Sequence, residues 1–183
     1  MGFFKKYGYT MLKLFLNQFA ISLFGLTLAI ASTAAGLNML ATVSSVFAVL
    51  FYLFLEYAVM WEVGAKDGIT AKARQTPRRL WRGFVISVCA NALNLLCAVL
   101  TLAQSVTNVP RLIAMFLQGM YLGILFQNVG EIPLYLRPWM FLLIVVPAVI
   151  VCGVAYILGQ YELHATNILI PKNKDVKNNG RPE

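Results

Sequence analysis

One long apolar run restricts the possible folds of this chain more than any other feature. It extends over 23 residues, from Met39 to Trp61, and carries a single charge, on Glu56. An α-helix rises about 1.5 Å per residue, so about 20 apolar residues cross the roughly 30 Å hydrocarbon core of a bilayer. Similar runs occur at about residues 14–31, 83–105 and 140–159. The sequence therefore predicts an all-α integral membrane protein.

Composition supports one membrane domain and little else. Of the 183 residues, 60% are hydrophobic, which is far above the usage of ordinary soluble domains. The chain left after removal of the apolar runs is too short for a second folded domain, so we expect residues 1–170 to form a single helical unit. Residues 171–183 are polar and basic without an apolar period, which predicts a disordered tail.

The net charge of +8 arises from lysines and arginines placed beside the apolar runs. Such residues are retained on the cytoplasmic side of a membrane and lie against anionic head groups, so we expect a lipid surface as a partner. Nucleic acid is not expected, because the sequence gives no sign of a basic groove studded with aromatic side chains to hold bases. The basic loop after the second run contains Lys66, Lys72, Arg74, Arg78, Arg79 and Arg82.

The segment from Leu112 to Gly130 decides the number of spans. It is uncharged and 19 residues long, but Gln118 and Gln127 fall on opposite faces of a helix. If it does not cross, 13 Lys and Arg lie inside and two outside; if it crosses, the division is ten and five. The positive-inside rule favours the first, which gives four antiparallel spans, both termini cytoplasmic and a re-entrant or half-spanning segment 112–130. Five spans is the alternative.

Two further expectations concern the first run and the basic loop. Lysines, an apolar stretch and Ala29-Ile30-Ala31 also fit a cleaved signal peptide, which stays an alternative for the first span. In the loop from Glu62 to Arg82, we expect Gly64, Gly68 and Pro77 to interrupt any long helix. The charge pattern suits a multi-pass protein of a bacterial plasma membrane.

Glu56 is the first candidate for a functional residue, because an ionisable group within a span is costly. It lies five residues, or about 7.5 Å, before Trp61. We therefore expect it to reach the inner interface or to pair with Arg78, Arg79 or Arg82. Coupling to an ion or proton is the alternative interpretation.

The third run contains a polar stripe on one helix face. Its members are Ser87, Asn91, Asn94, Ala98 and Thr101. In lipid, this face must contact protein or water. Hydrogen bonding between helices is the simpler interpretation, and the lining of a small-solute path is the other.

Small residues at helical spacing predict a tight bundle. They follow one face of the first run from Gln18 to Ser32 and of the last run from Ala148 to Gly159, with Pro147 expected to kink the latter. The three cysteines all fall within apolar runs and lack a CxxC spacing, so we expect small buried hydrophobes. They are Cys89, Cys97 and Cys152.

Catalysis has little support in the sequence. His164 is the sole histidine, and no HExxH, P-loop, GxGxxG or GxSxG pattern occurs, so we expect neither an enzyme nor a cofactor or metal. The leading hypothesis is a non-catalytic multi-pass membrane protein that acts by helix–helix association, as an accessory subunit or a homo-oligomer. The alternative is a small-solute or ion transporter or channel subunit with a polar path along the third span.

Overall fold

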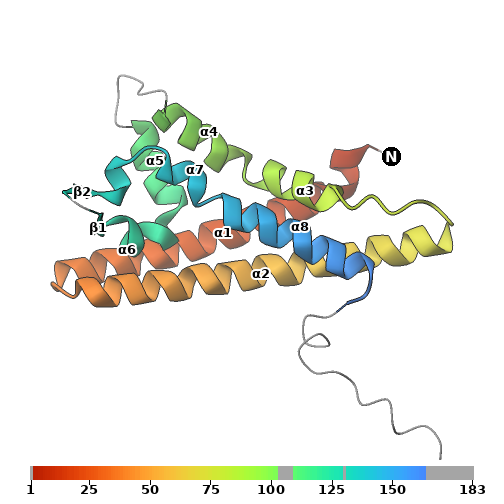
Figure 1. Ribbon diagram of the computed structural model, residues 1–183, viewed down its shortest axis with the longest axis horizontal. Helices are drawn as coiled ribbons and strands as arrows, with labels where there is room; N and C mark the ends of the chain where they lie inside the picture. The colour runs from red at the N-terminus through yellow and green to blue at the C-terminus, as the bar shows by residue number, and fades with distance from the viewer. Residues whose placement is uncertain (1, 103–108, 130, 164–183) are drawn as a thin grey trace, which may run out of the picture.

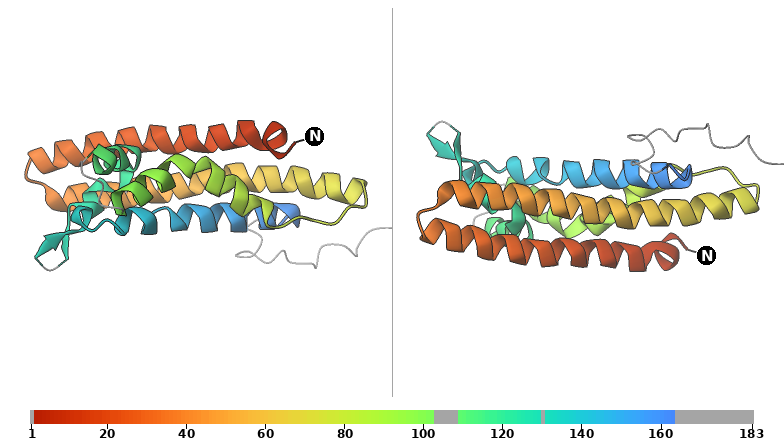
Figure 2. Two further views of the ribbon diagram at one scale, coloured as in Figure 1. Left: turned by 90° about the horizontal axis from the view of Figure 1, so that it is seen from above. Right: turned by 90° about the horizontal axis from the view of Figure 1, so that it is seen from below.

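Two long antiparallel helices form the pair on which the other elements pack. The computed structural model describes residues 2–102, 109–129 and 131–163. Helices α1 (Phe3–Ala34) and α2 (Asn38–Ala73) lie side by side along the length of the protein (Figures 1 and 2). Gly36, in the turn between them, has a φ of +74°, which glycine adopts without a steric penalty from a Cβ.

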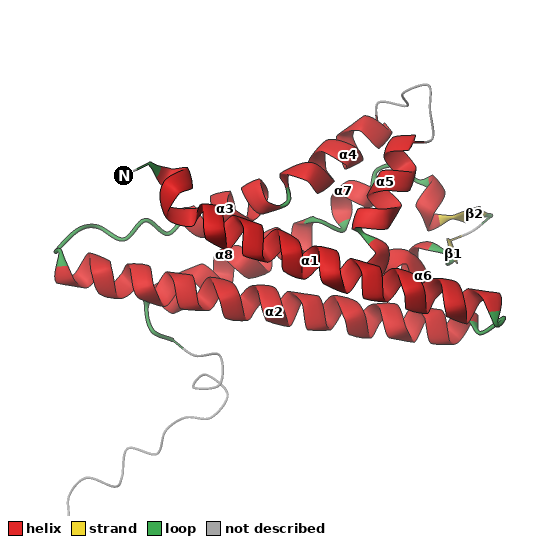
Figure 3. Cartoon of the chain, turned by 180° about the vertical axis from the view of Figure 1, so that it is seen from behind, coloured by secondary structure: helices red, strands yellow, loops and turns green. Residues whose placement is uncertain are grey.

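The rest of the described chain packs on this pair as short helices and one minimal strand pair (Figure 3). Strands β1 and β2 pair antiparallel over two residues each, so the described fold is otherwise helical, as predicted. The remaining elements are α3 (Arg82–Ala90), α4 (Ala92–Leu102), α5 (Val109–Leu117), η1 (Gly119–Tyr121), α6 (Leu122–Leu125), β1 (Asn128–Val129), β2 (Ile132–Pro133), η2 (Leu134–Leu136), α7 (Met140–Leu143) and α8 (Val146–Gln160).

Three helical stretches are long and apolar enough to cross a bilayer. They are α1, α2 and the α7–α8 stretch Met140–Gln160. A fourth candidate arises if α3 and α4, which meet at a bend of 64°, count as one span. By length and composition, therefore, the chain is a membrane-embedded protein. The predicted tail, residues 171–183, and His164 lie outside the described residues.

The segment 112–130 does not form one straight spanning helix. Its described part is divided among α5, η1 and α6, and the nine residues of α5 extend over only roughly 14 Å. Gly119 and Gly123 lie in this divided part, and each lies directly against a neighbouring helix: a Cβ on Gly119 would be 2.5 Å from the Ser22 carbonyl oxygen. A Cβ on Gly123 would overlap the carbonyl oxygen of Ala41.

The prediction that Gly64 and Gly68 interrupt the second helix is wrong, because α2 continues through both to Ala73. Each glycine instead permits close approach of α8. A Cβ on Gly64 would overlap the carbonyl oxygen of Tyr156, and a Cβ on Gly68 would be 2.5 Å from that of Gln160. The absence of side chains here thus serves contact between helices, and the energy of that contact exceeds the helix propensity lost at glycine.

The first helix also begins earlier than predicted, at Phe3 instead of about residue 14. Its added turns continue the buried face of the span, because Tyr7, Met11 and Leu14 are all buried. They pack with Met60 and Tyr156 in one hydrophobic cluster, so tertiary contacts stabilise a segment that hydropathy alone assigns to the interface.

The last span is interrupted where Pro147 predicts. α7 ends at Leu143, α8 begins at Val146, and Pro147 lies in the first turn of α8. Proline lacks the amide hydrogen that would bond to the carbonyl four residues earlier, so the helix cannot continue undisturbed through this position.

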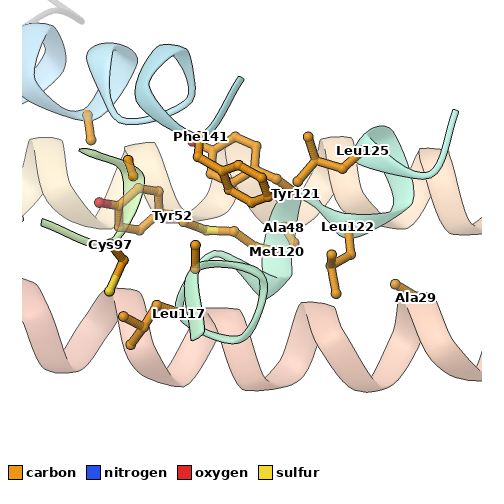
Figure 4. Close-up of a cluster of buried hydrophobic side chains, with 13 residues drawn as sticks. Ala29, Ala48, Tyr52, Cys97, Leu117, Met120, Tyr121, Leu122, Leu125 and Phe141 are labelled. Atoms are coloured by element: carbon orange, nitrogen blue, oxygen red, sulfur yellow. The ribbon is translucent and has the colours of Figure 1, made fainter. Parts of the chain in front are cut away.

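The predicted tight bundle is confirmed, because the small residues of the first and last spans lie buried inside the chain. A second hydrophobic cluster fills the end of the bundle near the α1–α2 turn, where Leu117, Met120 and Leu122 insert between α1 and α2 (Figure 4). Phe141 from α7 covers Tyr121 on the opposite side (Figure 4). The broken segment from α5 to α6 is therefore part of the core.

Candidate functional site

Polar side chains from every candidate span gather inside the bundle. They include all four residues predicted as an intramembrane site, which the structure thus brings together. We call the group the interior polar cluster. Its members, all buried, are Gln18, Tyr52, Glu56, Ser87, Asn91, Asn94, Gln118, Tyr121 and Cys152.

Glu56 is completely buried between α2 and α8, with an exposed fraction of 0%. The Cys152 thiol donates a hydrogen bond to its Oε2 over 3.3 Å, while Oε1 has no hydrogen-bond partner among the described residues. The expected pairing with an arginine is wrong. Glu56 belongs to the face of α2 that includes Tyr52, Met60 and Gly64, and this face points at α8 instead of at the interface.

The bend in the third candidate span is centred on Asn91. Its backbone N–H and its side-chain Nδ2 both donate to the carbonyl oxygen of Ser87, over 2.9 Å and 3.1 Å. Such a side-chain bond to the preceding turn competes with the regular ladder and bends helices. Asn94 then donates to Asn91 Oδ1 over 3.1 Å. The predicted stripe faces protein, and its second residue, Asn91, lies at the break.

A small cavity lies beside this bend. Its volume is about 10 Å³, close to the space that one water molecule needs. Gln18, Tyr52, Asn91, Gln118 and Tyr121 contribute polar side chains to its lining. Spans that are distant in sequence therefore meet at one polar point.

Tyr52 joins the cavity to Glu56. Its side chain lines the cavity beside Asn91, and Glu56 follows it by one helical turn on the same buried face of α2. Ser87 is buried in α3, one turn before Asn91. The shared cavity, the hydrogen bonds and the helical spacing thus bring most of the cluster together at one place in the bundle.

Several atoms of the cluster are buried without a hydrogen-bond partner. Burying an unpaired polar group costs roughly 1–3 kcal/mol, so such atoms are rare in folded proteins and each requires an explanation. The unpaired atoms of the cluster are Glu56 Oε1, Ser87 Oγ, Asn94 Oδ1, Tyr121 Oη and both amide atoms of Gln118.

Sequence reasoning did not assign five of these participants to the site: Tyr121 was not singled out, Cys152 was expected only as a small buried hydrophobe, and the other three are Gln18, Gln118 and Tyr52. Gln18 was noted only within a stripe of small residues, Gln118 only as part of an ambiguous segment, and Tyr52 not at all. Helical spacing gives a signal for two of them: Gln18 shares a face with Ser22, and Tyr52 precedes Glu56 by four residues. Gln118 is positioned by the break between α5 and η1, for which the sequence gives little warning.

A second polar group, at the other end of the α2–α8 contact, is centred on Asp67. This carboxylate accepts hydrogen bonds of 2.6 Å from Lys6 Nζ, Tyr7 Oη and Tyr156 Oη. Tyr7 Oη in turn accepts a 3.0 Å bond from Arg82 Nη1. This Asp67 network therefore connects α1, α2, α3 and α8.

The network changes the pKa values of both charged partners outside the apolar runs. Burial, the largest effect, raises the pKa of Asp67, but the hydrogen bonds from Lys6, Tyr156 and Tyr7 together lower it below the ordinary value of 3.8. For Lys6, burial lowers the pKa, but the bonds to Asp67 and Tyr7 outweigh it and raise the pKa above 10.5. Both residues are thus held in their charged forms.

The free energy of unfolding should therefore decrease as the pH becomes acidic. A lowered folded pKa means that Asp67 stabilises the fold above pH 3.8 and loses this contribution as the pH falls through the folded value. The contribution of Lys6 is present below pH 10.5 and is lost only above it. Thermal unfolding in detergent should show a decreasing midpoint from about pH 5 to about pH 3, and Asp67→Asn should flatten this decrease. An equal decrease in both proteins would contradict the assignment.

The predicted basic loop is divided by the structure. Lys66 and Lys72 belong to α2, and Lys66 forms an exposed ion pair with Glu62 one turn earlier. The four arginines instead surround a pocket of about 330 Å³ beside the Asp67 network. They are Arg74, Arg78, Arg79 and Arg82.

The described residues contain no group of three or more His, Cys, Asp or Glu side chains arranged to hold a metal ion. The chemistry that the interior polar cluster offers is that of one carboxyl group, one thiol and several amides and hydroxyls in a dry environment. These groups bind protons, small cations and hydrogen-bonding solutes.

Comparison of the chain with models of protein families, with curated proteins and with solved structures gives no match. The fold and the buried residues thus define only a class. The chain is a helical, membrane-embedded protein with a polar interior.

Proposed function

We propose that this chain is a transporter or channel subunit of the plasma membrane, in which Glu56 exchanges a proton or another small cation within the interior polar cluster. The observation that carries the proposal is the complete burial of Glu56 with one carboxyl oxygen unpaired. An ionised carboxylate buried without a partner costs several kcal/mol, so this group requires either a proton or a bound cation.

The position of the cluster supports the same conclusion. Asn91, at the junction of α3 and α4, lines the cavity together with Gln18 and Tyr52. Substrate and coupling-ion sites of membrane transporters are typically beside interrupted helices. The bend at Asn91 supplies such an interruption.

The arrangement of spans belongs to this proposal. Four spans, counting α3 and α4 as one, give two cytoplasmic termini and a cytoplasmic basic loop that faces anionic head groups. The segment from α5 to α6 then acts as a re-entrant element on the outer side. Its contacts with α1 and α2 support this role, because irregular backbone at membrane depth is tolerated only where protein or water covers it.

Helix–helix association with a partner protein or a second copy stays a prediction. Its main argument in the sequence was the stripes of small residues, and those stripes pack against other helices of the same chain. Gly25 lies against Met120, and Gly159 against Trp61. The geometry therefore favours the transport alternative. The protein is expected to be non-catalytic in either case.

A flux assay with a matched pair of variants tests the proposal. Purified protein in liposomes containing a pH-sensitive dye is driven by a potassium diffusion potential, and proton entry is recorded with and without sodium. We expect entry faster than in empty liposomes, abolished by Glu56→Gln because the replacement cannot release a proton. Glu62→Gln, the same change at an exposed position of α2, should leave the rate unchanged.

Two outcomes would contradict the proposal. One is a parent protein that passes protons and sodium no faster than empty liposomes at any potential. The other is an equal loss of proton entry in Glu56→Gln and Glu62→Gln. Circular dichroism checks that both variants are folded. Intact-complex mass from native membranes would then become the relevant measurement for the association hypothesis.

A further inference from the structure

We infer that the pocket beside the Asp67 network is a binding site for one phosphate-bearing anion, independent of the interior polar cluster. The pocket lies at the end of the bundle where α2, α3 and α8 approach one another, and its volume is about 330 Å³. This is within the range of sites for small ligands and is large enough for a phosphate group with a small substituent.

The charge of the lining specifies an anion. Lys6 and the four arginines bring five positive charges to the pocket, and Asp67 is the single acidic residue of the lining. Arginine presents a planar fork of donors that matches phosphate oxygens two at a time, which a lysine ammonium does not. The prevalence of arginine among these charges therefore favours phosphate over a simple halide or a diffuse surface attraction.

Asp67 does not oppose such a ligand, because its own acceptors are occupied. Its carboxylate already accepts three hydrogen bonds of 2.6 Å, one of them from Lys6 in an ion pair. The network thereby neutralises the one acidic group and fixes the wall of the pocket formed by α1, α2 and α8. Arg82, which donates to Tyr7, extends this fixed wall to the first residue of α3.

The location points to a source for the phosphate. Asp67 lies six residues, or about 9 Å, beyond Trp61 along α2, just outside the apolar run. Basic pockets between spans at this depth receive the head groups of anionic phospholipids. Free inorganic phosphate has the same chemistry, so the experiment must distinguish the two sources.

The test is a calorimetric titration, in which a probe is added to the full chain in a mild detergent and the heat of binding is measured. The probes are dioctanoyl phosphatidylglycerol, dioctanoyl phosphatidylcholine and inorganic phosphate. The pocket variant is Arg74→Gln with Arg79→Gln, because neither residue belongs to the Asp67 network. The control is Lys66→Gln with Lys72→Gln, which removes the same charge from the same region but outside the pocket lining.

We expect saturable binding of one phosphatidylglycerol per chain, weaker by about tenfold or more in the pocket variant, since each replaced arginine removes charge-assisted hydrogen bonds to the phosphate. The control should change affinity less than about threefold. If inorganic phosphate also binds, and the pocket variant weakens its binding as well, the site is assigned to free phosphate. If phosphatidylglycerol binds and inorganic phosphate does not, the site is assigned to a lipid head group. Both outcomes support a phosphate site.

Two results would overturn the inference. One is the absence of saturable binding for all three probes. The other is equal weakening in the pocket and control variants, which would indicate general attraction to a basic surface. If the double pocket variant does not fold, as judged by its unfolding midpoint, the single variant Arg79→Gln should still weaken binding more than Lys72→Gln.

Discussion

Replacement of Gly64 by alanine is expected to lower the free energy of unfolding by about 2 kcal/mol, although alanine is the better helix former. The added Cβ would overlap the backbone carbonyl of Tyr156, which cannot rotate away as a side chain does. α8 must therefore move off α2, and the contact between the two helices that holds Glu56 and Asp67 is loosened.

Gly8→Ala is the matched control for this prediction. Gly8 also lies within a helix, α1, but a Cβ there would meet nothing within 4 Å. The same substitution should thus stabilise the protein by about 0.5–1 kcal/mol, through helix propensity alone. Thermal or denaturant unfolding in detergent measures both. If both variants changed the free energy of unfolding in the same direction, the close approach of α8 would not be the reason for glycine at position 64.

The second large effect is expected for Asp67→Asn, which should destabilise the fold by about 3 kcal/mol. Asparagine presents an amide donor where the carboxylate accepts, so at least one of Lys6, Tyr7 and Tyr156 loses its acceptor. The two tyrosines are almost completely buried, at 2% and 0% exposed, so water cannot replace the missing bonds. The lost connection joins α1, α2 and α8.

Glu62→Gln provides the comparison, because it also neutralises an acidic residue of α2 that pairs with a lysine. This pair is exposed and joins residues one turn apart on the same helix, so we expect a change below about 0.5 kcal/mol. Unfolding at neutral pH distinguishes the two variants directly. A similar small change for both would mean that the Asp67 network forms without adding to stability.

The two sites share one helix contact but should respond separately to substitution. Glu56 and Asp67 lie eleven residues, or about 16 Å, apart along α2. Substitutions at such a separation usually have additive effects. The proton flux proposed for Glu56 should thus survive in the Arg74 and Arg79 variant, in which the proposed phosphate binding is weakened.

Much of the architecture was predictable because hydrophobicity and helical period are properties of a local stretch of chain. The apolar runs predicted the bilayer-spanning helices, the polar stripe from Ser87 to Thr101 predicted a face turned toward protein, and Pro147 predicted the break in the last span. Each inference needs only the identities of residues within one helix.

Errors arose where a residue acts on a partner far along the chain. Gly64 and Gly68 have a low helix propensity, and only the carbonyls of Tyr156 and Gln160 opposite them explain why α2 continues. Glu56 was assigned to the interface from its distance to Trp61, but the rotation of α2 about its axis directs it to Cys152. Propensity and depth are local, whereas these contacts are not.

The sequence by itself determined that this chain is a bundle of helices long and apolar enough to cross a membrane, because the transfer of apolar residues into lipid is nearly additive along the chain. Only the tertiary structure decided which polar groups meet. The rotation and register of α2 against α8, set by the close approach at Gly64 and Gly68, bring Glu56 to Cys152 and Asp67 to Tyr156. The same packing leaves Oε1 of Glu56 unpaired and the arginines gathered around one pocket, and no local pattern encodes either result.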